Sequence, residues 1–349
     1  MPVLPIPVKA PRSRDARHVL LKARALVDPE LRAAVGSLPA PARNVAAYHF
    51  GWRDERGRPS SGGVGKFLRP ALVLLACEGV GGRPQQALRA AVTVELVHNM
   101  SLIHDDVIDR DALRRHRPTV WSVFGLPAAI LTGDALLSLA GRILADAPGH
   151  AGMTGRAWLD DAVQELIAGE FADSTAENRE AVTLQESVAT AEAKTGSLIA
   201  LSCALGALAG GADEARVGHL RSFGRHLGAA FQLTDDILGI WGDPKITGKP
   251  YLSDLRSRKK SLPVVAALAA PGQAARELAG LYHSPAVLTD AELMQVAELV
   301  EAAGGRAWAE CEAGRRLTEA IAGLEAADLT RTAYDDLSAL TRMITGRDH

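Results

Sequence analysis

Cysteine is scarce in this sequence. The 349 residues contain three cysteines, Cys77, Cys203 and Cys311, which lie far apart and in no spacing typical of a metal site. Because the number is small and odd, a disulfide framework is excluded. The pattern favours buried thiols in a reducing compartment.

Long apolar runs and an excess of one charge are also missing. No stretch reaches the roughly 18 consecutive apolar residues of a membrane-spanning helix, and residues 1–18 carry prolines where a signal peptide needs an apolar helix. Lys and Arg total 39 against 41 Asp and Glu, a net charge of -2, so no field over the whole protein attracts nucleic acid. We therefore expect a cytoplasmic protein with no integral membrane segment and no nucleic-acid partner.

Proline is absent from residues 149–243 and 286–349. Because an interior proline costs a helix roughly 3 kcal/mol, these gaps permit long helices, and the alternation typical of strands is missing. Apolar residues instead recur three and four positions apart, which predicts helices in Leu88–Ile108, Ala193–Leu208, Leu220–Ile240 and Leu288–Val300. The sequence therefore predicts an all-α fold.

No segment divides the chain into two domains. Composition changes little after residue 15, and no linker rich in Ser, Pro or Gly is present. We expect one helical domain over residues 15–349, preceded by a flexible N-terminal arm, residues 1–14, that contains four prolines. Segments rich in glycine or proline predict loops at 51–65, 81–82, 210–211 and 244–250.

Two segments place adjacent aspartates inside an apolar helix, SLIHDDVID from Ser101 and FQLTDDILG from Phe231. Asp105 and Asp109 are one turn apart on one face, with Asp106 beside them. A solvated helix end usually explains a lone Asp-Asp pair, but the apolar neighbours predict burial, and buried carboxylates need a positive partner. Mg²⁺ is commonly held by one or two carboxylates together with substrate phosphates. The two pairs therefore predict a metal and diphosphate site.

Basic residues gather around both aspartate pairs and favour a phosphate ligand. They are Lys66, Arg69, Arg114, Arg115, Lys194, Lys249, Lys259 and Lys260. His98 is seven residues before Asp105 and shares its helix face, where both a core histidine and a substrate contact fit. Gln232 stands one turn before Asp236 and Thr195 follows Lys194, so both fit the same cavity. No Ser, Cys or His stands in the spacing of a nucleophile and its base.

In order and spacing, GKFLRP, DDVID, AKTG and FQLTDDILG resemble motifs of the trans-isoprenyl diphosphate synthases, the polyprenyl synthetase family. The resemblance covers residues 60–270 and implies an all-α isoprenoid synthase bundle around a central cavity. It also implies a homodimeric, Mg²⁺-dependent prenyltransferase. Such an enzyme joins isopentenyl diphosphate to an allylic diphosphate, which is dimethylallyl, geranyl or farnesyl diphosphate.

The resemblance implies roles for individual residues. Two Mg²⁺ ions would be held by Asp105 and Asp109 with Asp106 in support, and a third by Asp235 with Asp236 in support. The allylic diphosphate would contact Arg114, Lys194, Lys249 and Lys259. The diphosphate of isopentenyl diphosphate would contact Lys66, Arg69, His98 and Arg115. Thr195 and Gln232 would line the reacting carbons, which completes a catalytic set of Asp105, Asp106, Asp109, Arg114, Lys194, Thr195, Gln232 and Asp235.

Three positions depart from the family pattern. Phe67 stands where the family often has Arg. Gly239 replaces the third aspartate of the second motif and leaves Asp235, Asp236 and Asp243 as candidate acidic groups, which predicts weaker or altered binding of the third metal and not its loss. Arg258 stands where the family usually has Gly before the lysine, so the choice of Lys259 over Lys260 depends on the alignment.

Two other functions share parts of this pattern. A class I terpene cyclase would have the same fold and first motif, but TDDILGIWGD differs from the Asn-Asp, Ser, Glu pattern of cyclases, which also have little use for a second diphosphate site such as Lys66 with Arg69. A non-catalytic subunit of a heteromeric synthase would be expected to lose aspartate ligands, and Asp105, Asp106 and Asp109 are present.

Product length in this family is set by side chains one to three turns before the first motif. Here these positions are Ser101, Met100, Val97 and Val94. No aromatic residue stands at 100 or 101, which predicts room for a tail beyond C15. Met100 is flexible but bulky, so we expect growth to stop at the C20 product, geranylgeranyl diphosphate. Val94 and Val97, each taken alone, also fit ordinary core positions.

Overall fold

The structure is a computed structural model of the chain, and it describes residues 15–60, 65–147, 150–176, 179, 181–244, 250–284 and 286–346. The predicted N-terminal arm, residues 1–14, and Lys249 lie outside these ranges. The elements in chain order are α1 Ala16–Gly36, α2 Ala40–His49, α3 Leu68–Gly79, α4 Pro84–Ile108, β1 Leu113–Arg114, β2 Arg117–Pro118, α5 Val120–Phe124, α6 Leu126–Ala145, α7 His150–Ala176, α8 Leu184–Ala191, the π-helix η1 Glu192–Gly196, α9 Ser197–Ala209, α10 Glu214–Trp241, α12 Ser253–Arg256, α13 Leu262–Ala269, α14 Gln273–Tyr282, α15 Asp290–Ala302, α16 Gly305–Ala326 and α17 Arg331–Thr345.

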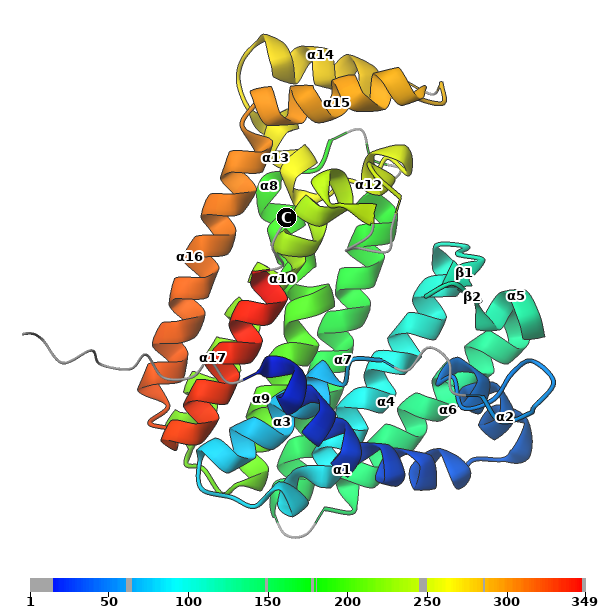
Figure 1. Cartoon of the computed structure of the whole chain (residues 1–349), viewed down its shortest axis with the longest axis vertical. Coiled ribbons are helices and arrows are strands. Elements are labelled where there is room, and N and C mark those ends of the chain that lie inside the picture. The colour runs from blue at the N-terminus through cyan, green and yellow to red at the C-terminus, as the bar shows by residue number, and fades with distance from the viewer. Residues whose placement is uncertain are drawn as a thin grey trace, which may run out of the picture.

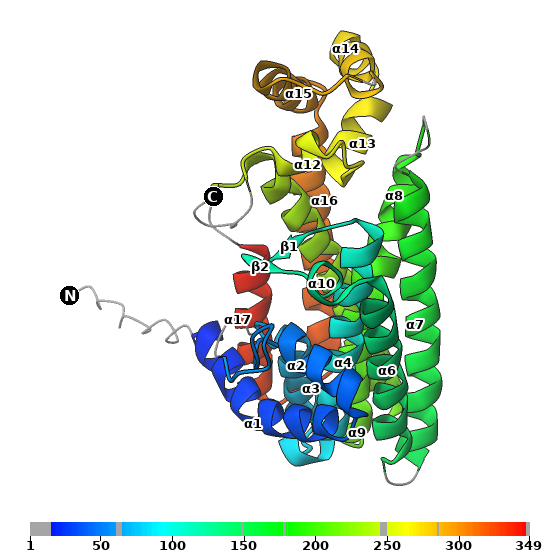
Figure 2. The ribbon, with the colours of Figure 1, turned by 90° about the vertical axis from the view of Figure 1, so that its right-hand side faces the viewer.

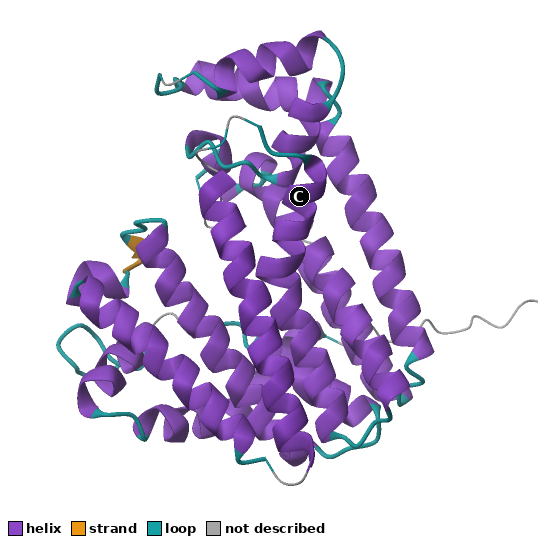
Figure 3. Cartoon of the chain, turned by 180° about the vertical axis from the view of Figure 1, so that it is seen from behind, coloured by secondary structure: helices purple, strands orange, loops and turns teal. Residues whose placement is uncertain are grey.

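The long helices form a bundle, and nearly all of the described chain is helical (Figures 1 and 3). Helix α4 packs against α3, α6 and α9, while α10 packs against α9 and α16. Helix α9 lies between these layers, and its sequence, SLIALSCALGALA, is apolar on every side because nearly all of it is buried. Figure 2 shows α6, α7 and α8 along one side of the bundle. The predicted all-α fold is confirmed.

The predicted helices match the observed ones closely. Leu88–Ile108 lies within α4, Leu220–Ile240 lies within α10, and Ala193–Leu208 lies within η1 and α9. The fourth prediction began at Leu288, but α15 begins at Asp290. The difference arises because Thr289 caps the helix by accepting a hydrogen bond from the backbone N–H of Glu292.

A short hairpin was not predicted. Strands β1 and β2 pair antiparallel, with Leu113 opposite Pro118 and Arg114 opposite Arg117. The turn between them holds Arg115 at φ 50° and His116 at φ 61°, the left-handed conformation of a two-residue hairpin turn. Residues other than glycine rarely adopt this left-handed conformation, so the sequence contains no signal for this turn.

A smaller apolar cluster lies beyond the main core. It joins the end of α10 to α12, α14 and α15 through buried residues that include Ile240, Leu255, Leu278 and Val296. Figure 1 shows these helices at one end of the bundle, with α14 and α15 outermost. This cluster fixes α12 against the helix that carries the second aspartate pair.

Among the described residues, one helix is long and apolar enough by composition to cross a membrane. This helix is α6. Asp134 and Arg142 interrupt its apolar sequence, so it contains no unbroken apolar run of the length on which the sequence prediction was based. Of its most apolar stretch, 44% is buried inside the protein. This helix packs against α4 as part of the bundle.

Candidate active site

A cavity of about 620 Å³ opens between α4, α7, α8, η1 and α10. Most of the residues predicted for the active site line it, although they come from distant parts of the sequence. They are Arg69, His98, Ser101, Asp105, Arg114, Lys194, Thr195, Gln232, Asp235, Asp236 and Lys259.

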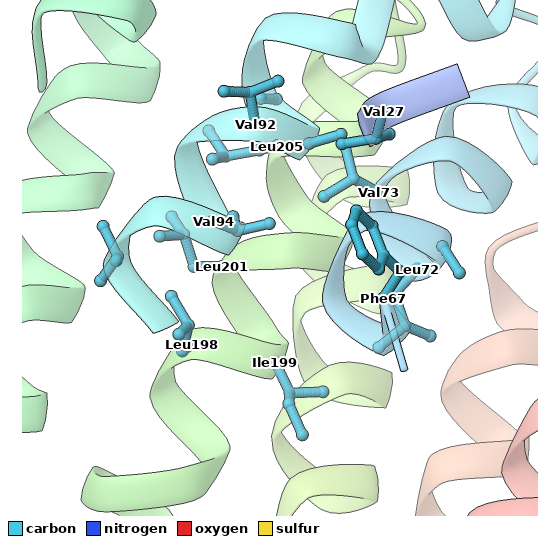
Figure 4. Close-up of a cluster of buried hydrophobic side chains, with 14 of the residues drawn as sticks. Val27, Phe67, Leu72, Val73, Val92, Val94, Leu198, Ile199, Leu201 and Leu205 are labelled. Carbon is cyan, nitrogen blue, oxygen red and sulfur yellow. The ribbon is translucent and has the colours of Figure 1, made fainter. Parts of the chain in front are cut away.

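Several predicted residues lie elsewhere. Asp109 caps the exposed end of α4, and Lys66 is exposed just before α3. Arg115 lines a small pocket that adjoins the cavity and shares Arg114 with it. Three of the four predicted chain-length positions are buried in the apolar core and do not line the cavity. They are Val94, shown in Figure 4, Val97 and Met100.

Phe67 lies in the same apolar core. Its side chain is buried, and Figure 4 places it near Leu72. Its backbone has φ 55°, the left-handed conformation, immediately before the first residue of α3. A buried phenyl ring offers no contact to diphosphate, so the arginine common in the family has no functional equivalent at this position.

The first aspartate pair forms a crowded group of acids at the end of α4. Burial and the carboxylate of Glu170 raise the pKa of Asp105 to about 7, while Lys194 and Arg114 oppose the rise. Partial loss of solvent around Asp109 also raises its pKa, with Lys194 opposing and Glu170 adding to the rise. The two carboxylates are one turn apart on the same face. Such a group is favourable only with a strong positive charge beside it.

Asp106 has turned away from this group. Its side chain is 1% exposed, and Arg114 donates from Nε to Asp106 Oδ1 over 2.6 Å. Burial raises the pKa of Asp106 to about 6 against the effect of Arg114. This geometry favours a role for Asp106 in holding Arg114 over the supporting metal role expected from the sequence.

Lys194 is held by the π-helix η1. Its Nζ lies 2.8 Å from Glu170 Oε2 and 2.8 Å from Asp173 Oδ2, both on α7. Burial alone would lower the pKa of Lys194, but Asp173 and Asp105 outweigh it and raise the pKa above its ordinary value. Single π-turns of this kind occur often at functional sites, where they displace a side chain from the regular helical path.

Two glycines let neighbouring helices approach η1 closely. A Cβ on Gly169 of α7 would lie 2.7 Å from the backbone N of Lys194, and one on Gly228 of α10 would lie 2.6 Å from Gly196 Cα. Any larger residue would push these helices apart. The close packing places Lys194 and Thr195 between α7 and α10.

The second aspartate pair divides into two environments. Both residues line the cavity, but Asp236 is buried, and each of its carboxylate oxygens accepts a hydrogen bond. Gln232 Nε2 donates to Asp236 Oδ1 over 2.8 Å, and the backbone N–H of Leu262 donates to Oδ2 over 2.9 Å. Thr195 Oγ1 in turn donates to Gln232 Oε1 over 2.6 Å. Asp236 therefore orients Gln232 directly and Thr195 through Gln232.

Lys259 points toward this pair and Lys260 does not. Lys259 Nζ lies 3.6 Å from Asp236 Oδ1, and that carboxylate raises the pKa of Lys259 against the effect of burial. Lys260 Nζ donates to the backbone carbonyls of Ala176 and Arg179. Lys259, and not Lys260, is therefore the lysine beside the second aspartate pair.

Cationic groups gather on the other side of Asp105. Burial, with the guanidinium groups of Arg69 and Arg115, lowers the pKa of His98 well below its ordinary value, so the ring is neutral. Burial lowers the pKa of Arg69 to about 10, which leaves it charged at neutral pH. This cluster is the one predicted to hold the diphosphate of isopentenyl diphosphate.

A buried acid supports the cationic cluster. Glu95 is 4% exposed, and its Oε1 accepts a hydrogen bond from Asn99 Nδ2 over 3.0 Å. His49 Nε2 lies 3.1 Å from Asn99 Oδ1. Because the Asn99 amide nitrogen donates to Glu95, its oxygen is the acceptor, so His49 carries its proton on Nε2. The chain His49, Asn99 and Glu95 links α2 to the base of the site.

Sequence reasoning missed Glu95, Glu170 and Asp173. Glu170 and Asp173 are three residues apart on one helix face in the apolar segment LIAGEFAD, and Glu95 is three residues before His98. Acidic residues at helical spacing in apolar surroundings predict such positions even where the acids are not adjacent.

The described residues supply some, but not all, of the ligands of a divalent metal ion. No three His, Cys, Asp or Glu side chains among them lie close enough to enclose an ion. Asp105 and Asp235, however, border one cavity from two helices, and each supplies hard oxygen ligands. Mg²⁺ is commonly held in this manner, by one or two carboxylates completed by water and substrate phosphates. Asp106 Oδ2 is also buried without a hydrogen-bond partner, but Asp106 does not line the cavity.

Known proteins resemble the chain over nearly its whole length. A family model described as polyprenyl synthetase matches residues 59–300. The (2E,6E)-farnesyl diphosphate synthase of Mycobacterium tuberculosis is 49% identical over 313 residues, with 88% of this chain and 87% of that protein covered. The geranylgeranyl diphosphate synthase of the same organism is 43% identical over 339 residues, with 95% and 94% covered.

Solved structures give the same result. The crystal structure of a polyprenyl synthetase from Streptomyces coelicolor has a TM-score of 0.91 and 45% identity, with 95% of this chain and 99% of that chain covered. The structure of geranylgeranyl pyrophosphate synthase from Corynebacterium glutamicum, complexed with isoprenyl diphosphate and magnesium, has a TM-score of 0.81 and 25% identity, with 95% and 99% covered. The chain therefore belongs to the polyprenyl synthetase family of trans-isoprenyl diphosphate synthases and is a trans-prenyltransferase.

Proposed function

We propose that this enzyme condenses isopentenyl diphosphate with an allylic diphosphate to give the C20 product geranylgeranyl diphosphate. The observation that carries the proposal is the lining of the cavity. No Phe, Tyr or Trp is among the described residues that line it, and small side chains from α7 and α8 are frequent there. Ala172 and Ala176 lie on α7, and Ala189 lies on α8. A cavity without a bulky stop accommodates a tail longer than C15.

The residues around the cavity suit this reaction. The C1–O bond of the allylic diphosphate breaks, and its electron pair leaves with the diphosphate. The double bond of isopentenyl diphosphate attacks C1, and the proton lost from its C2 passes to the departing diphosphate. Arg114, Lys194 and Lys259 would hold the leaving group and stabilise the charge that develops on it. Apolar side chains of the lining, among them Leu102 and Leu166, would shield the carbocation from water.

Asp105, Asp109 and Asp235 would hold Mg²⁺, with three ions in each site. Bound there, the metal ions would neutralise the diphosphate charge and favour its departure. The magnesium complex of the Corynebacterium glutamicum relative supports this assignment. Arg69, Arg115, Lys66 and His98 would bind isopentenyl diphosphate, and His98 would do so as a neutral hydrogen-bond donor.

Product analysis tests the proposal. The purified protein is incubated with Mg²⁺, isopentenyl diphosphate and each of three primers, dimethylallyl, geranyl and farnesyl diphosphate. We expect C20 as the main product from every primer and no turnover without Mg²⁺. Accumulation of C15, with farnesyl diphosphate not extended, would instead assign the enzyme as a farnesyl diphosphate synthase, the activity named for the relative that is 49% identical.

We also propose that the enzyme is a cytoplasmic homodimer joined through α6 and α7. These helices pack against each other and carry large exposed apolar side chains. They are Leu126, Ile130, Leu131, Met153, Ile167 and Phe171. Exposed apolar side chains gathered on neighbouring elements typically mark an interface.

Light scattering should give twice the monomer mass for the wild type and for Val287→Glu, an exposed apolar position away from α6 and α7. The double variant Leu131→Glu with Phe171→Glu should be monomeric, and a dimer in that variant would place the interface elsewhere.

A further inference from the structure

The first residue of η1 faces away from the cavity. Glu192 begins this π-turn, and its backbone carbonyl accepts a hydrogen bond from the backbone N–H of Ser197, as in a single turn of π-helix. Residues 193–195 line the cavity, but Glu192 is not part of the described lining. Its carboxylate reaches α16 instead, where Glu192 Oε1 lies 2.5 Å from Arg316 Nη1. The turn thus presents Lys194 to the cavity and Glu192 to a neighbouring helix.

Arg316 is buried, and a second acid holds it in place. The residue is 9% exposed, and its Nε lies 2.8 Å from Glu312 Oε1, one turn earlier on α16. A buried arginine is unfavourable unless its charge is paired, and its planar guanidinium has donors enough for two carboxylates. Helix α16 itself packs along α10, the helix that carries the second aspartate pair (Figure 1). Arg316 is therefore a fixed point in the bundle to which Glu192 is attached.

Ion pairs hold η1 from two sides. On the cavity side, Lys194 pairs with Glu170 and Asp173, and both acids lie on α7. The helix that leads into the turn, α8, contributes less, because every one of its residues is at least partly exposed. Elements with few buried contacts open more readily than core helices do. The pair between Glu192 and Arg316 therefore fixes η1 at the end that α8 holds weakly.

We propose that Arg316 is a positioning residue of the prenyltransferase reaction, which holds Lys194 at the allylic diphosphate by pairing with Glu192. Arg316 contacts the side of η1 opposite the cavity, so it acts through the turn and not on the substrate. An ion pair at the first residue of the turn limits movement of the lysine two residues later. This inference rests on the proposed function, because the proposed function assigns Lys194 to the leaving diphosphate.

Substrate binding without turnover provides the test. Calorimetry measures the affinity of the full-length protein for geranyl diphosphate with Mg²⁺ and without isopentenyl diphosphate, so that no chain is extended. Glu192→Gln keeps the shape of the side chain, removes the ion pair and leaves Arg316 paired with Glu312. We expect it to weaken the affinity by about 3- to 30-fold, as for coupled residues in one network. The KM for isopentenyl diphosphate should stay unchanged.

Arg316→Gln removes the same ion pair from α16 and serves as the test if Glu192→Gln does not fold. Glu312 keeps a partner in this variant, because it also pairs with Arg315. Arg315→Gln is the matched control, since Arg315 is exposed on the same helix and pairs with Glu312 and Glu319. Its affinity for geranyl diphosphate should equal that of the wild type.

A double-mutant cycle separates positioning from a loss of stability. In a Lys194→Gln background, Glu192→Gln should cause no further loss of affinity, because the group that it positions is absent. Leu324→Ala, at a buried position of α16, lowers the melting temperature without touching η1. At a temperature where this variant is folded, it should bind geranyl diphosphate as the wild type does.

The outcomes distinguish the role of Arg316 from the proposed function. Wild-type affinity in a folded Glu192→Gln or Arg316→Gln variant would overturn the role of Arg316 and leave the proposed function intact. The same conclusion would follow if Glu192→Gln caused equal losses with and without Lys194. Wild-type affinity in Lys194→Gln would instead overturn the proposed role of Lys194, and this inference with it.

Discussion

Arg114 and Asp106 form an ion pair across the end of α4, with 2.6 Å between Nε and Oδ1. The pair connects the β1–β2 hairpin to the helix that carries the first aspartate motif. It also distinguishes the adjacent acids, because Asp105 lines the cavity and Asp106 does not. Two neighbouring residues in the sequence thus have separate roles, one toward the metal and one toward the arginine.

Asparagine substitutions should separate these roles. Asp105→Asn should reduce turnover by orders of magnitude, because a cavity carboxylate proposed to bind Mg²⁺ is lost. Asp106→Asn removes the partner of Arg114 and should lower the free energy of unfolding by about 1.5 to 3 kcal/mol. Its Mg²⁺ concentration for half-maximal activity should stay unchanged. Chemical unfolding and Mg²⁺ titrations measure both quantities, and equal loss of Mg²⁺ dependence in the two variants would restore Asp106 as a metal ligand.

Arg69 and Arg114 should act on different substrates. Arg69→Ala should mainly raise the KM for isopentenyl diphosphate, and Arg114→Ala the KM for the allylic diphosphate, because Arg69 borders the cavity from α3 and Arg114 from β1. A lost charge-assisted contact is worth roughly 1.5 to 3 kcal/mol, or about 10- to 150-fold.

Arg117→Ala serves as the control for the two arginine variants. Arg117 belongs to the same hairpin as Arg114 but donates to the backbone carbonyl of Tyr48. Its replacement should change neither KM selectively. Equal effects of Arg69→Ala and Arg114→Ala on one substrate would contradict the assignment.

Low pH should destabilise the protein through His49. Burial, followed by the charge of Arg114, lowers the pKa of His49 to about 3, with Arg115 and Arg117 acting in the same direction. Below pH 6.5 the unfolded chain therefore binds a proton that the folded chain refuses, and stability falls as pH decreases toward 3. Between pH 7 and pH 5 this costs up to about 2 kcal/mol.

The variant His49→Gln isolates this effect. Its amide can still donate to Asn99, but it does not titrate. Urea unfolding at pH 7 and pH 5 should show a smaller loss for the variant than for the wild type. His98 titrates in both proteins and Asp106 lines the same small pocket as His49, so only the difference between the two proteins is interpreted. Equal losses would mean that His49 is not kept neutral by the fold.

The sequence predicted α4, α10 and most of α9, and eleven of the residues that line the cavity. Apolar spacing without proline predicts helices α4 and α10. The same spacing puts Asp105 on the face of α4 that carries His98, and Asp236 on the face of α10 that carries Gln232. The assignment of the two diphosphate groups came from the resemblance. Local periodicity and known motifs were sufficient for the cavity residues of α4 and α10, but not for Asp173 on α7.

The remaining features depend on contacts between distant segments. Gly169 and Gly228 allow α7 and α10 to approach η1 closely, and neither glycine is near Lys194 in the sequence. The pairing of Lys194 with Asp173 and the contact of Asp254 with Gly239 likewise require the folded chain. The spacing of apolar residues in a single sequence does not predict contacts between distant segments.

Arg258 should stabilise the loop that carries Lys259. Its backbone has φ 54°, which explains why a glycine suits this position, yet its guanidinium donates to the carbonyls of Leu281, Tyr282 and Ala286. Arg258→Gly relieves the backbone but loses these charged hydrogen bonds, so we expect a net loss of about 2 kcal/mol and a higher KM for the allylic substrate.

Arg256→Ala is the matched control for Arg258. Arg256 forms an exposed ion pair with Asp290, which is worth about 0 to 1 kcal/mol. Its removal should leave the melting temperature and both KM values nearly unchanged. A stable Arg258→Gly with wild-type KM would show that the three carbonyl contacts do not hold Lys259 in place.

Product length should respond to Ser101 more than to Met100. Ser101 lines the cavity one turn before Asp105, whereas Met100 is buried in the apolar core beside it. Ser101→Phe puts an aromatic ring across the cavity and should shorten the main product by at least one C5 unit. Met100→Ala should lengthen the product only if the tail reaches that part of the core, and otherwise should mainly destabilise the fold by about 2 to 5 kcal/mol. Chromatography of the products and thermal unfolding of both variants distinguish these results. Unchanged products in both variants would place the tail along α7 and α8, away from the positions that the sequence predicted.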